Sequence, residues 1–172
     1  MNKQQIINRT IIKEGGYCNN PNDSGGETNY GITVKVARRL GYRGMMKDLT
    51  LDFAYRVYAD NYWGSVNLDD VFSESPLIAS HLFDISVNMG ASRAGKFLQR
   101  GLNLLTKSDL KVDSHVGDET VKSLRSYMQR RNDSETLCKL LNTFKSAHYI
   151  HLAETRDKDR AFIYGWIKNR VD

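Results

Sequence analysis

Residues 14–33 read EGGYCNNPNDSGGETNYGIT, and this stretch is the least regular part of the chain. It is dense in Gly, Asn, Asp, Ser and Pro, which favour turns, and it has no helical periodicity. We therefore predict a loop or a short irregular hairpin. Gly15-Gly16 is expected to end the segment before it, because glycine is common just after a helix.

An amphipathic helix is predicted immediately before this loop. Its apolar face recurs at helical spacing and consists of Ile6, Ile7, Thr10, Ile11 and Glu14. We therefore expect Glu14 to end the buried face of this helix.

Most of the remaining chain also has helical periodicity. Short helices are expected from Thr33 to Leu40 and from Leu51 to Trp63-Gly64. From Pro76 onward nearly every segment is predicted to be helical, with a break at residues 88–90 and a polar linker at 106–119. Further along, one apolar stripe is formed by Leu137, Leu140, Leu141, Phe144, Ala147 and His148, and a final aromatic helix carries Phe162, Tyr164 and Trp166.

These elements predict a mainly α fold with a small irregular or β element near the N-terminus and a helical C-terminal lobe. The turn at Met89-Gly90 is the only candidate boundary in the sequence. We therefore expect two regions, residues 1–90 and residues 91–172, which pack together as one compact unit.

The composition is that of a soluble globular protein with a basic balance. Among 172 residues there are 25 Lys plus Arg against 20 Asp plus Glu, giving a net charge of +5. This charge either favours an anionic partner or only maintains solubility. Two cysteines are too few for a disulfide scaffold, and no signal peptide or membrane-spanning stretch is apparent. We expect synthesis in the cytoplasm without stable membrane association.

Two carboxylates near the loop suit glycoside hydrolysis, which needs one protonated and one ionised carboxyl group. Burial and the negative end of the helix dipole both disfavour the ionised form of Glu14. Asp23 lies in a polar loop whose amides and water favour its ionised form. The alternatives are an ordinary helix-end Glu14 and an Asx-turn Asp23.

Neighbouring residues offer further candidates for contacts with a sugar. Thr28 and Asn29 are expected either to orient a water molecule or to bond backbone. The side chains of Tyr17, Tyr30 and Trp63 either stack on sugar rings or belong to the core.

The segments EGGY (14–17) and DSGGETNYGIT (23–33) resemble the signature of the glycoside hydrolase family 108 muramidases of phage endolysins and bacterial toxin-export systems. They are similar, more distantly, to T-even phage lysozymes, whose motif is Glu, eight residues, Asp, five residues, Thr. Glu14 and Asp23 keep the first spacing. Asn29 occupies the third position, and Thr28 precedes it by one residue.

The resemblance extends over most of the chain. Residues 83–90, with Asp84 and Asn88, resemble the junction between the catalytic and peptidoglycan-binding parts of this family. Residues 113–120 resemble its Asp-Gly-x-x-Gly-x-x-Thr turn, which either contacts sugar or caps a helix begun at Thr120. Residues 162–170 resemble its terminal helix.

The resemblance implies a lysozyme-like N-acetylmuramidase that needs no cofactor. Glu14 would protonate the glycosidic oxygen, while Asp23, with Thr28 or Asn29, would position or deprotonate water. An inverting reaction would place the two carboxyl groups roughly 6.5 to 9.5 Å apart.

The expected partners are peptidoglycan glycan strands. Substrate contacts are expected from Tyr17, Asn29, Tyr30, Asp84 and Asn88. The enzyme would therefore act on peptidoglycan in the periplasm or cell wall, where it would serve either lysis or protein export. We expect a monomer.

The rival interpretations are a lytic transglycosylase, a non-catalytic peptidoglycan-binding protein and a basic nucleic-acid binder. The Asp23 loop argues against the first and the intact residues 14–17 argue against the second. No docking motif supports a nucleic-acid partner. The histidines lack the spacing of zinc ligands, so we expect no metal, and Cys18 would be a nucleophile only beside a histidine base.

Overall fold

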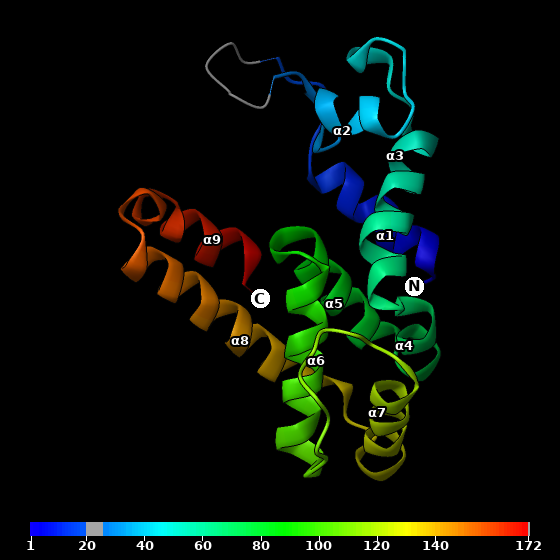
Figure 1. The fold of residues 1–172 in the computed structure, drawn as a ribbon, viewed down its shortest axis with the longest axis vertical. Coiled ribbons are helices and arrows are strands. Elements are labelled where there is room, and N and C mark those ends of the chain that lie inside the picture. The colour runs from blue at the N-terminus through cyan, green and yellow to red at the C-terminus, as the bar shows by residue number, and fades with distance from the viewer. Residues whose placement is uncertain (20–25, 172) are drawn as a thin grey trace. The chain divides into compact units, whose positions relative to one another are not determined.

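A computed structural model describes residues 1–19 and 26–171 of the chain. The chain forms two compact units, Met1–Gly64 and Ser65–Asp172, called here the N-terminal and C-terminal units. Figure 1 shows the elements of each unit. We expected a boundary near Gly90, whereas the compact units meet at Gly64. The functional division at residues 90/91 stays a prediction.

The N-terminal unit is built on two helices that pack together, α1 (Lys3–Lys13) and α3 (Leu51–Tyr58). Helix α1 begins with a capping box in which the side chains and amides of Asn2 and Gln5 bond reciprocally. The predicted stripe of α1 is confirmed for three residues, since Ile6, Ile7 and Ile11 are buried.

A small hairpin and short helices complete this unit. Strands β1 (Thr28–Asn29) and β2 (Ile32–Thr33) pair antiparallel, which agrees with the hairpin predicted for this region. The short helix predicted after Thr33 is α2 (Val34–Arg39), whose first turn is capped by the Thr33 hydroxyl. A 3-10 turn, η1 (Met46–Asp48), precedes α3.

Helix α3 continues as a π-helical turn, η2 (Ala59–Trp63). The helix predicted from Leu51 to Trp63-Gly64 is therefore present, but it changes its winding after Tyr58. Trp63 is fully buried, and the Lys3 ammonium lies 5.4 Å from the centre of its ring. Trp63 thus belongs to the core, and the alternative of sugar stacking is wrong.

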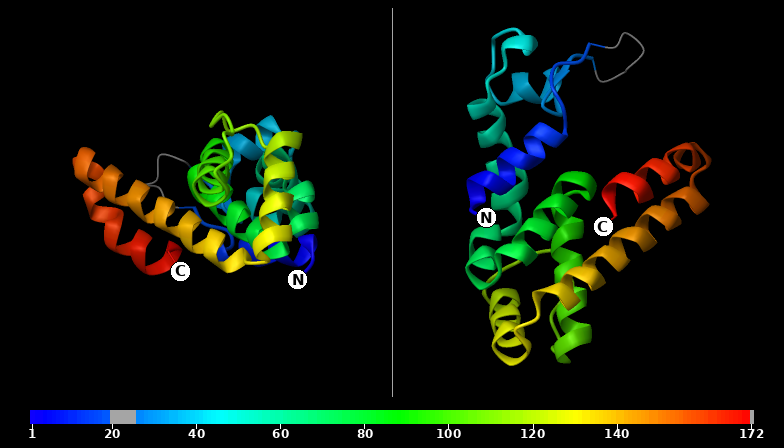
Figure 2. Two further views of the ribbon diagram at one scale, coloured as in Figure 1. Left: turned by 90° about the horizontal axis from the view of Figure 1, so that it is seen from below. Right: turned by 180° about the vertical axis from the view of Figure 1, so that it is seen from behind.

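All the regular secondary structure in the described part of the C-terminal unit is helical. A 3-10 turn, η3 (Gly64–Val66), leads into it, and a second one, η4 (Asp157–Phe162), lies between its last two helices. Helix α5 (Pro76–Met89) packs against α4 (Leu68–Glu74), α6 (Ala91–Thr106) and α8 (Ser134–Thr155). Figure 2 shows α8 and α9 (Ile163–Arg170) side by side, in orange and red.

The predicted break between α5 and α6 is confirmed at Gly90, whose φ of 89° is unfavourable for other residues. The next helix, α7 (Asp118–Arg131), begins after Gly117. Thr120 is buried inside its first turn, so a helix beginning at Thr120 is wrong. The side chain of Thr120 faces inward, and its hydroxyl oxygen lies 3.5 Å from the amide nitrogen of the buried Gln99 side chain. Thr120 therefore packs inside the helix and does not begin it.

The apolar stripe predicted for α8 is only partly correct. Leu137 and Leu141 are buried, but Ala147 is exposed and Lys145 is buried instead. The buried residues of α8 recur mainly every four positions, whereas the predicted stripe consisted mostly of its apolar residues. Within the described residues, no helix has the length and apolar character that crossing a membrane requires.

Candidate active site

Glu14 lies directly after α1, as its C-cap, and its amide donates to the carbonyl of Thr10 over 3.0 Å. Gly15 follows with a φ of 91°, which confirms the predicted helix stop. Glu14 itself is exposed. The expectation of a buried carboxyl is therefore wrong, because the helix ends before its apolar face reaches this position.

The β1–β2 hairpin has a two-residue turn, Tyr30-Gly31, that lies against Glu14. Both turn residues have positive φ, 50° at Tyr30 and 71° at Gly31, as a type I′ turn requires. A Cβ atom added to Gly31 would lie 3.2 Å from Cβ of Glu14 and 2.8 Å from the hydroxyl oxygen of Tyr58. Glycine is therefore needed both for the turn and for this close approach.

Tyr58, at the end of α3, is the residue of this cluster that the sequence analysis did not single out for the site. Its buried hydroxyl donates to the carbonyl oxygen of Tyr30 over 3.0 Å. Burial, and then the charge of Glu14 and the neighbouring Tyr62, raise the pKa of Tyr58 above its ordinary value. The hydroxyl therefore stays protonated and can serve as a donor.

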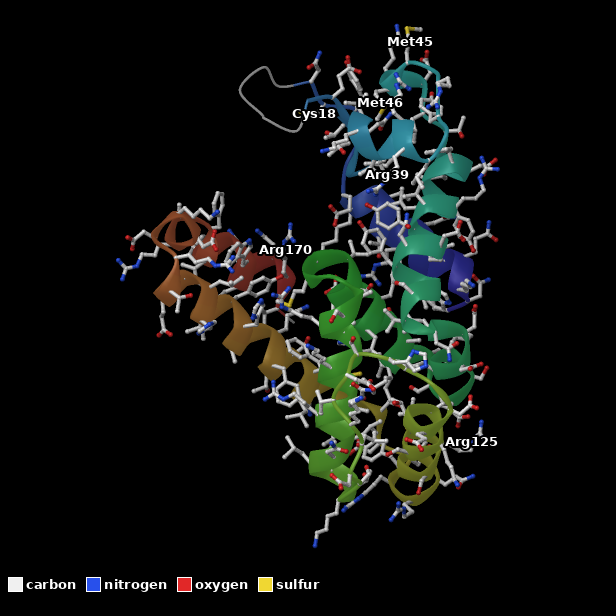
Figure 3. The ribbon with its side chains drawn as sticks, in the orientation of Figure 1. Cys18, Arg39, Met45, Met46, Arg125 and Arg170 are labelled. Carbon is white, nitrogen blue, oxygen red and sulfur yellow. The ribbon has the colours of Figure 1, made fainter. Side chains whose placement is uncertain are left out.

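The other candidates of the hairpin have different surroundings. The amide of Asn29 is buried and donates to the carbonyl of Met46 over 2.8 Å, so this side chain supports the fold. Thr28 is half-buried and pairs through its backbone with Cys18. Figure 3 labels Cys18 and Met46 at these places. Because side chains alternate along a strand, Thr28 faces away from the buried side that Asn29 occupies.

Two further predicted residues differ in what the structure says of them. Tyr17 is 45% exposed, which leaves its ring accessible. Asp23 lies outside the described residues, so the expected separation of the two carboxyl groups stays a prediction.

Asp84 and Asn88 lie on α5, in the C-terminal unit, and belong to a polar network there. Asp84 accepts from the ammonium of the buried Lys145 at 2.8 Å, and Asn88 donates to Asp84 over 3.1 Å. Arg170, labelled in Figure 3, donates to the side-chain oxygen of Asn88. These contacts give both residues a structural part, and their contact with substrate stays a prediction.

Lys145 was missed by sequence reasoning. The signal was a lysine four residues after Leu141 on the predicted helix, in line with the buried face. The nearby Tyr149 is also buried, and desolvation raises the pKa of its hydroxyl, with Arg170 opposing that shift.

The remaining alternatives have little structural support. The segment of residues 1–64 contains no histidine that could serve Cys18 as a base. Burial raises the pKa of Cys138 to about 12, which makes its thiol a poor nucleophile. Within the described residues, no group of three or more His, Cys, Asp or Glu side chains could hold a metal ion.

Two family models together match most of the chain. The model of glycosyl hydrolase 108 matches residues 7–90, which include Glu14, Asp23 and the hairpin. Residues 7–90 are a glycosyl hydrolase 108 region. Residues 93–171 match a second model, described as a predicted peptidoglycan domain. The protein is therefore a glycoside hydrolase that acts on peptidoglycan.

Solved structures of similar fold include SagA from Brucella abortus. It is 24% identical to this chain, with a TM-score of 0.70, over 95% of this chain and 86% of that one. This likeness concerns the fold, and it agrees with the mainly α, lysozyme-like architecture that we predicted. No curated protein matches the sequence.

Proposed function

We propose that the protein is an N-acetylmuramidase that hydrolyses the β-1,4 bond between N-acetylmuramic acid and N-acetylglucosamine, with Glu14 as general acid. The observation that carries the proposal is the position of Glu14, exposed at the end of α1 with the Tyr30-Gly31 turn against its side chain. A glycan strand can therefore reach the carboxyl group without a rearrangement of the helix.

Glu14 is exposed, so the fold alone does not remove its carboxyl group from water. A bound sugar would exclude water from the carboxyl group and disfavour its ionised form, so the substrate itself would complete the desolvation. The protonated group would then donate to the glycosidic oxygen as the bond to C1 breaks.

Water attack needs a second polar group on the other face of the sugar. We assign this role to Asp23, whose support is its spacing from Glu14, with Thr28 as its partner. Thr28 is preferred to Asn29 because the Asn29 amide is already bonded to the carbonyl of Met46. Contact of Tyr17 and Tyr30 with the sugar rings is part of the same proposal.

The proposed site of action is the peptidoglycan layer, reached during phage lysis or protein export. Substrate binding by Asp84 and Asn88 is a separate part of the proposal, and it rests on the sequence motif of residues 83–90. The division into a catalytic region 1–90 and a binding region 91–172 rests on that motif and on the ranges of the two family models.

The products of digestion test the proposal. Purified peptidoglycan should yield fragments that end in reducing N-acetylmuramic acid, identified by mass spectrometry after borohydride reduction. Anhydro ends would assign a lytic transglycosylase instead, and reducing N-acetylglucosamine would assign a glucosaminidase. Binding without any released fragment would make the protein a non-catalytic peptidoglycan binder.

A further inference from the structure

A basic groove runs along one face of α6 in the C-terminal unit. Its volume is about 470 Å³, and its lining consists of Met89, Ser92, Arg93, Lys96, Phe97, Arg100 and Val112. The three cations are spaced three and four residues apart, so they share one face of the helix. No carboxylate is among the lining residues.

The charges of this groove are not neutralised within the described part of the chain. The guanidinium of Arg93 donates to the carbonyl of Met89 over 2.8 Å, and that of Arg100 lies 4.5 Å from the ring centre of Phe144. Neither contact supplies a negative charge, and Lys96 makes no ion pair with a described residue. All three side chains are exposed and available to an anion.

The charge of Arg93 on α6 also acts on a histidine of α8. The pKa of His148 is lowered, first by burial and then by the charges of Arg93, His151 and Arg156. Arg93 and Arg156 therefore both lie near His148, which adds one more cation close to the groove.

The floor of the groove is apolar. Met89 and Phe97 are 9% and 7% exposed, and the side chain of Val112 borders them. A ligand that fits both parts carries carboxylates on short aliphatic segments. A guanidinium group can bind a carboxylate through two parallel hydrogen bonds. The two arginines therefore favour a ligand with carboxylates over a monoatomic anion.

We propose that this groove binds the carboxylates of the stem peptides of peptidoglycan, an inference that rests on the proposed function. Stem peptides carry free carboxylates and small aliphatic side chains within a few residues. A flat lipid surface would not use a concave groove of this size, and nucleic-acid phosphates would leave its apolar floor without a partner. The groove therefore binds the peptide part of the substrate, whereas Glu14 is proposed to act on the glycan bond.

The test measures binding of a purified disaccharide-tetrapeptide to the full chain by isothermal titration calorimetry. This ligand has no muramidase-sensitive bond, so its binding is independent of turnover. Replacing the three cations by Gln (Arg93→Gln, Lys96→Gln and Arg100→Gln) should weaken binding about tenfold, because exposed ion pairs each contribute modestly. Amidation of the ligand carboxylates should weaken binding to the unaltered chain by a similar factor, with little further loss in the triple variant.

A matched control removes three other cations of the same unit, Arg130, Arg131 and Lys139, which do not line the groove. This control should bind the tetrapeptide as the unaltered chain does. Thermal unfolding of both variants checks their folding, and Lys96→Gln alone, expected to bind about twofold more weakly, keeps the test decisive if the triple variant unfolds.

Several results would overturn the inference. Equal tetrapeptide binding by the groove variant and the control would do so, as would an equal loss with the peptide-free disaccharide. Selective loss of binding to phosphatidylglycerol vesicles or duplex DNA, with tetrapeptide binding intact, would assign the groove to a membrane or nucleic acid. Digestion of whole peptidoglycan is scored separately, so a failure of the muramidase proposal is distinguishable from a failure of the groove.

Discussion

The hydroxyl of Tyr58 donates a hydrogen bond to the carbonyl oxygen of Tyr30, 28 residues earlier in the chain, over 3.0 Å. This bond joins the end of α3 to the hairpin turn that lies against Glu14. Tyr30 has a φ of 50°, which is costly for a residue with a side chain. The hydrogen bond therefore helps to hold a strained turn in the place where Glu14 needs a fixed neighbour.

Removing that hydroxyl should disturb the site without emptying the core. Tyr58→Phe should lower the free energy of unfolding by about 1 kcal/mol, because it deletes one hydrogen bond. We expect kcat to fall about fivefold with little change in KM, since the turn beside Glu14 loses its alignment. The matched control is Tyr55→Phe on the same helix, where the hydroxyl has no hydrogen bond with a described residue. Equal kinetics for the two variants would remove Tyr58 from the site.

Gly31 should tolerate no side chain. Gly31→Ala adds a Cβ atom 2.8 Å from the Tyr58 hydroxyl oxygen, at a φ of 71°. Both the clash and the backbone strain should lower the free energy of unfolding, together by about 2 kcal/mol. Gly41→Ala is the control for strain alone, because Gly41 has a φ of 89° and no atom within 4 Å of the added Cβ. Urea unfolding and turnover should both be worse for Gly31→Ala, and equal values would contradict the close packing around Glu14.

Glu14→Gln tests the proposed acid directly. The amide keeps the size of the side chain but cannot donate the proton, so turnover should fall roughly 100- to 10,000-fold. Folding and binding to insoluble peptidoglycan should persist, because Glu14 is exposed. Asp23→Asn should cause a smaller loss if Asp23 mainly positions water, and Glu154→Gln on α8 is a control for an exposed glutamate. Full activity of Glu14→Gln would refute the assignment.

Asp113 should make stability fall at acid pH. Hydrogen bonds from the Gln99 side chain and the His115 amide lower the pKa of Asp113 in the folded protein. Its contribution is thus fully present above the unfolded value of about 3.9 and is lost as pH falls through the lower folded pKa. The difference in free energy of unfolding between the wild type and Asp113→Asn should shrink below about pH 4.

The measurement is urea unfolding at several pH values, with Asp109→Asn as the control. Asp109 is exposed in the same linker, and its side chain makes no hydrogen bond or ion pair with a described residue. A constant difference between wild type and Asp113→Asn from pH 7 to pH 2 would show that Asp113 does not stabilise the linker through its charge.

Variants of Asp84 distinguish its structural role from a role in substrate binding. Asp84→Asn leaves the Lys145 ammonium buried without its carboxylate, which should cost about 1 to 3 kcal/mol of stability. Lys145→Met together with Asp84→Asn should recover part of that loss, since no buried charge remains. If KM rises in the double variant at a temperature where it is fully folded, Asp84 also contacts substrate.

Local chemistry predicted the first helix, its glycine stop and the hairpin region, because these depend on neighbours in sequence. The burial of Glu14 was predicted wrongly, since periodicity indicates a face but not how far other elements cover it. The turn at Tyr30-Gly31 could not be predicted from the sequence, because tyrosine rarely adopts a positive φ. The hydrogen-bond partner of Tyr30, Tyr58, is also remote in sequence. Lys145 lies in line with the buried face of its helix, but its pairing with Asp84 depends on the packing of another helix.

The break at Gly90 lies close to where the two family models meet, yet α5 and α6 on its two sides pack together within one compact unit. A recombination event at this point would transfer α5 away from α6 and α8, which cover its apolar face. The ranges matched by the two family models are thus different from the ranges that fold as compact units. Exchange of binding regions between such enzymes would succeed only if the new partner supplies helices that fit α5.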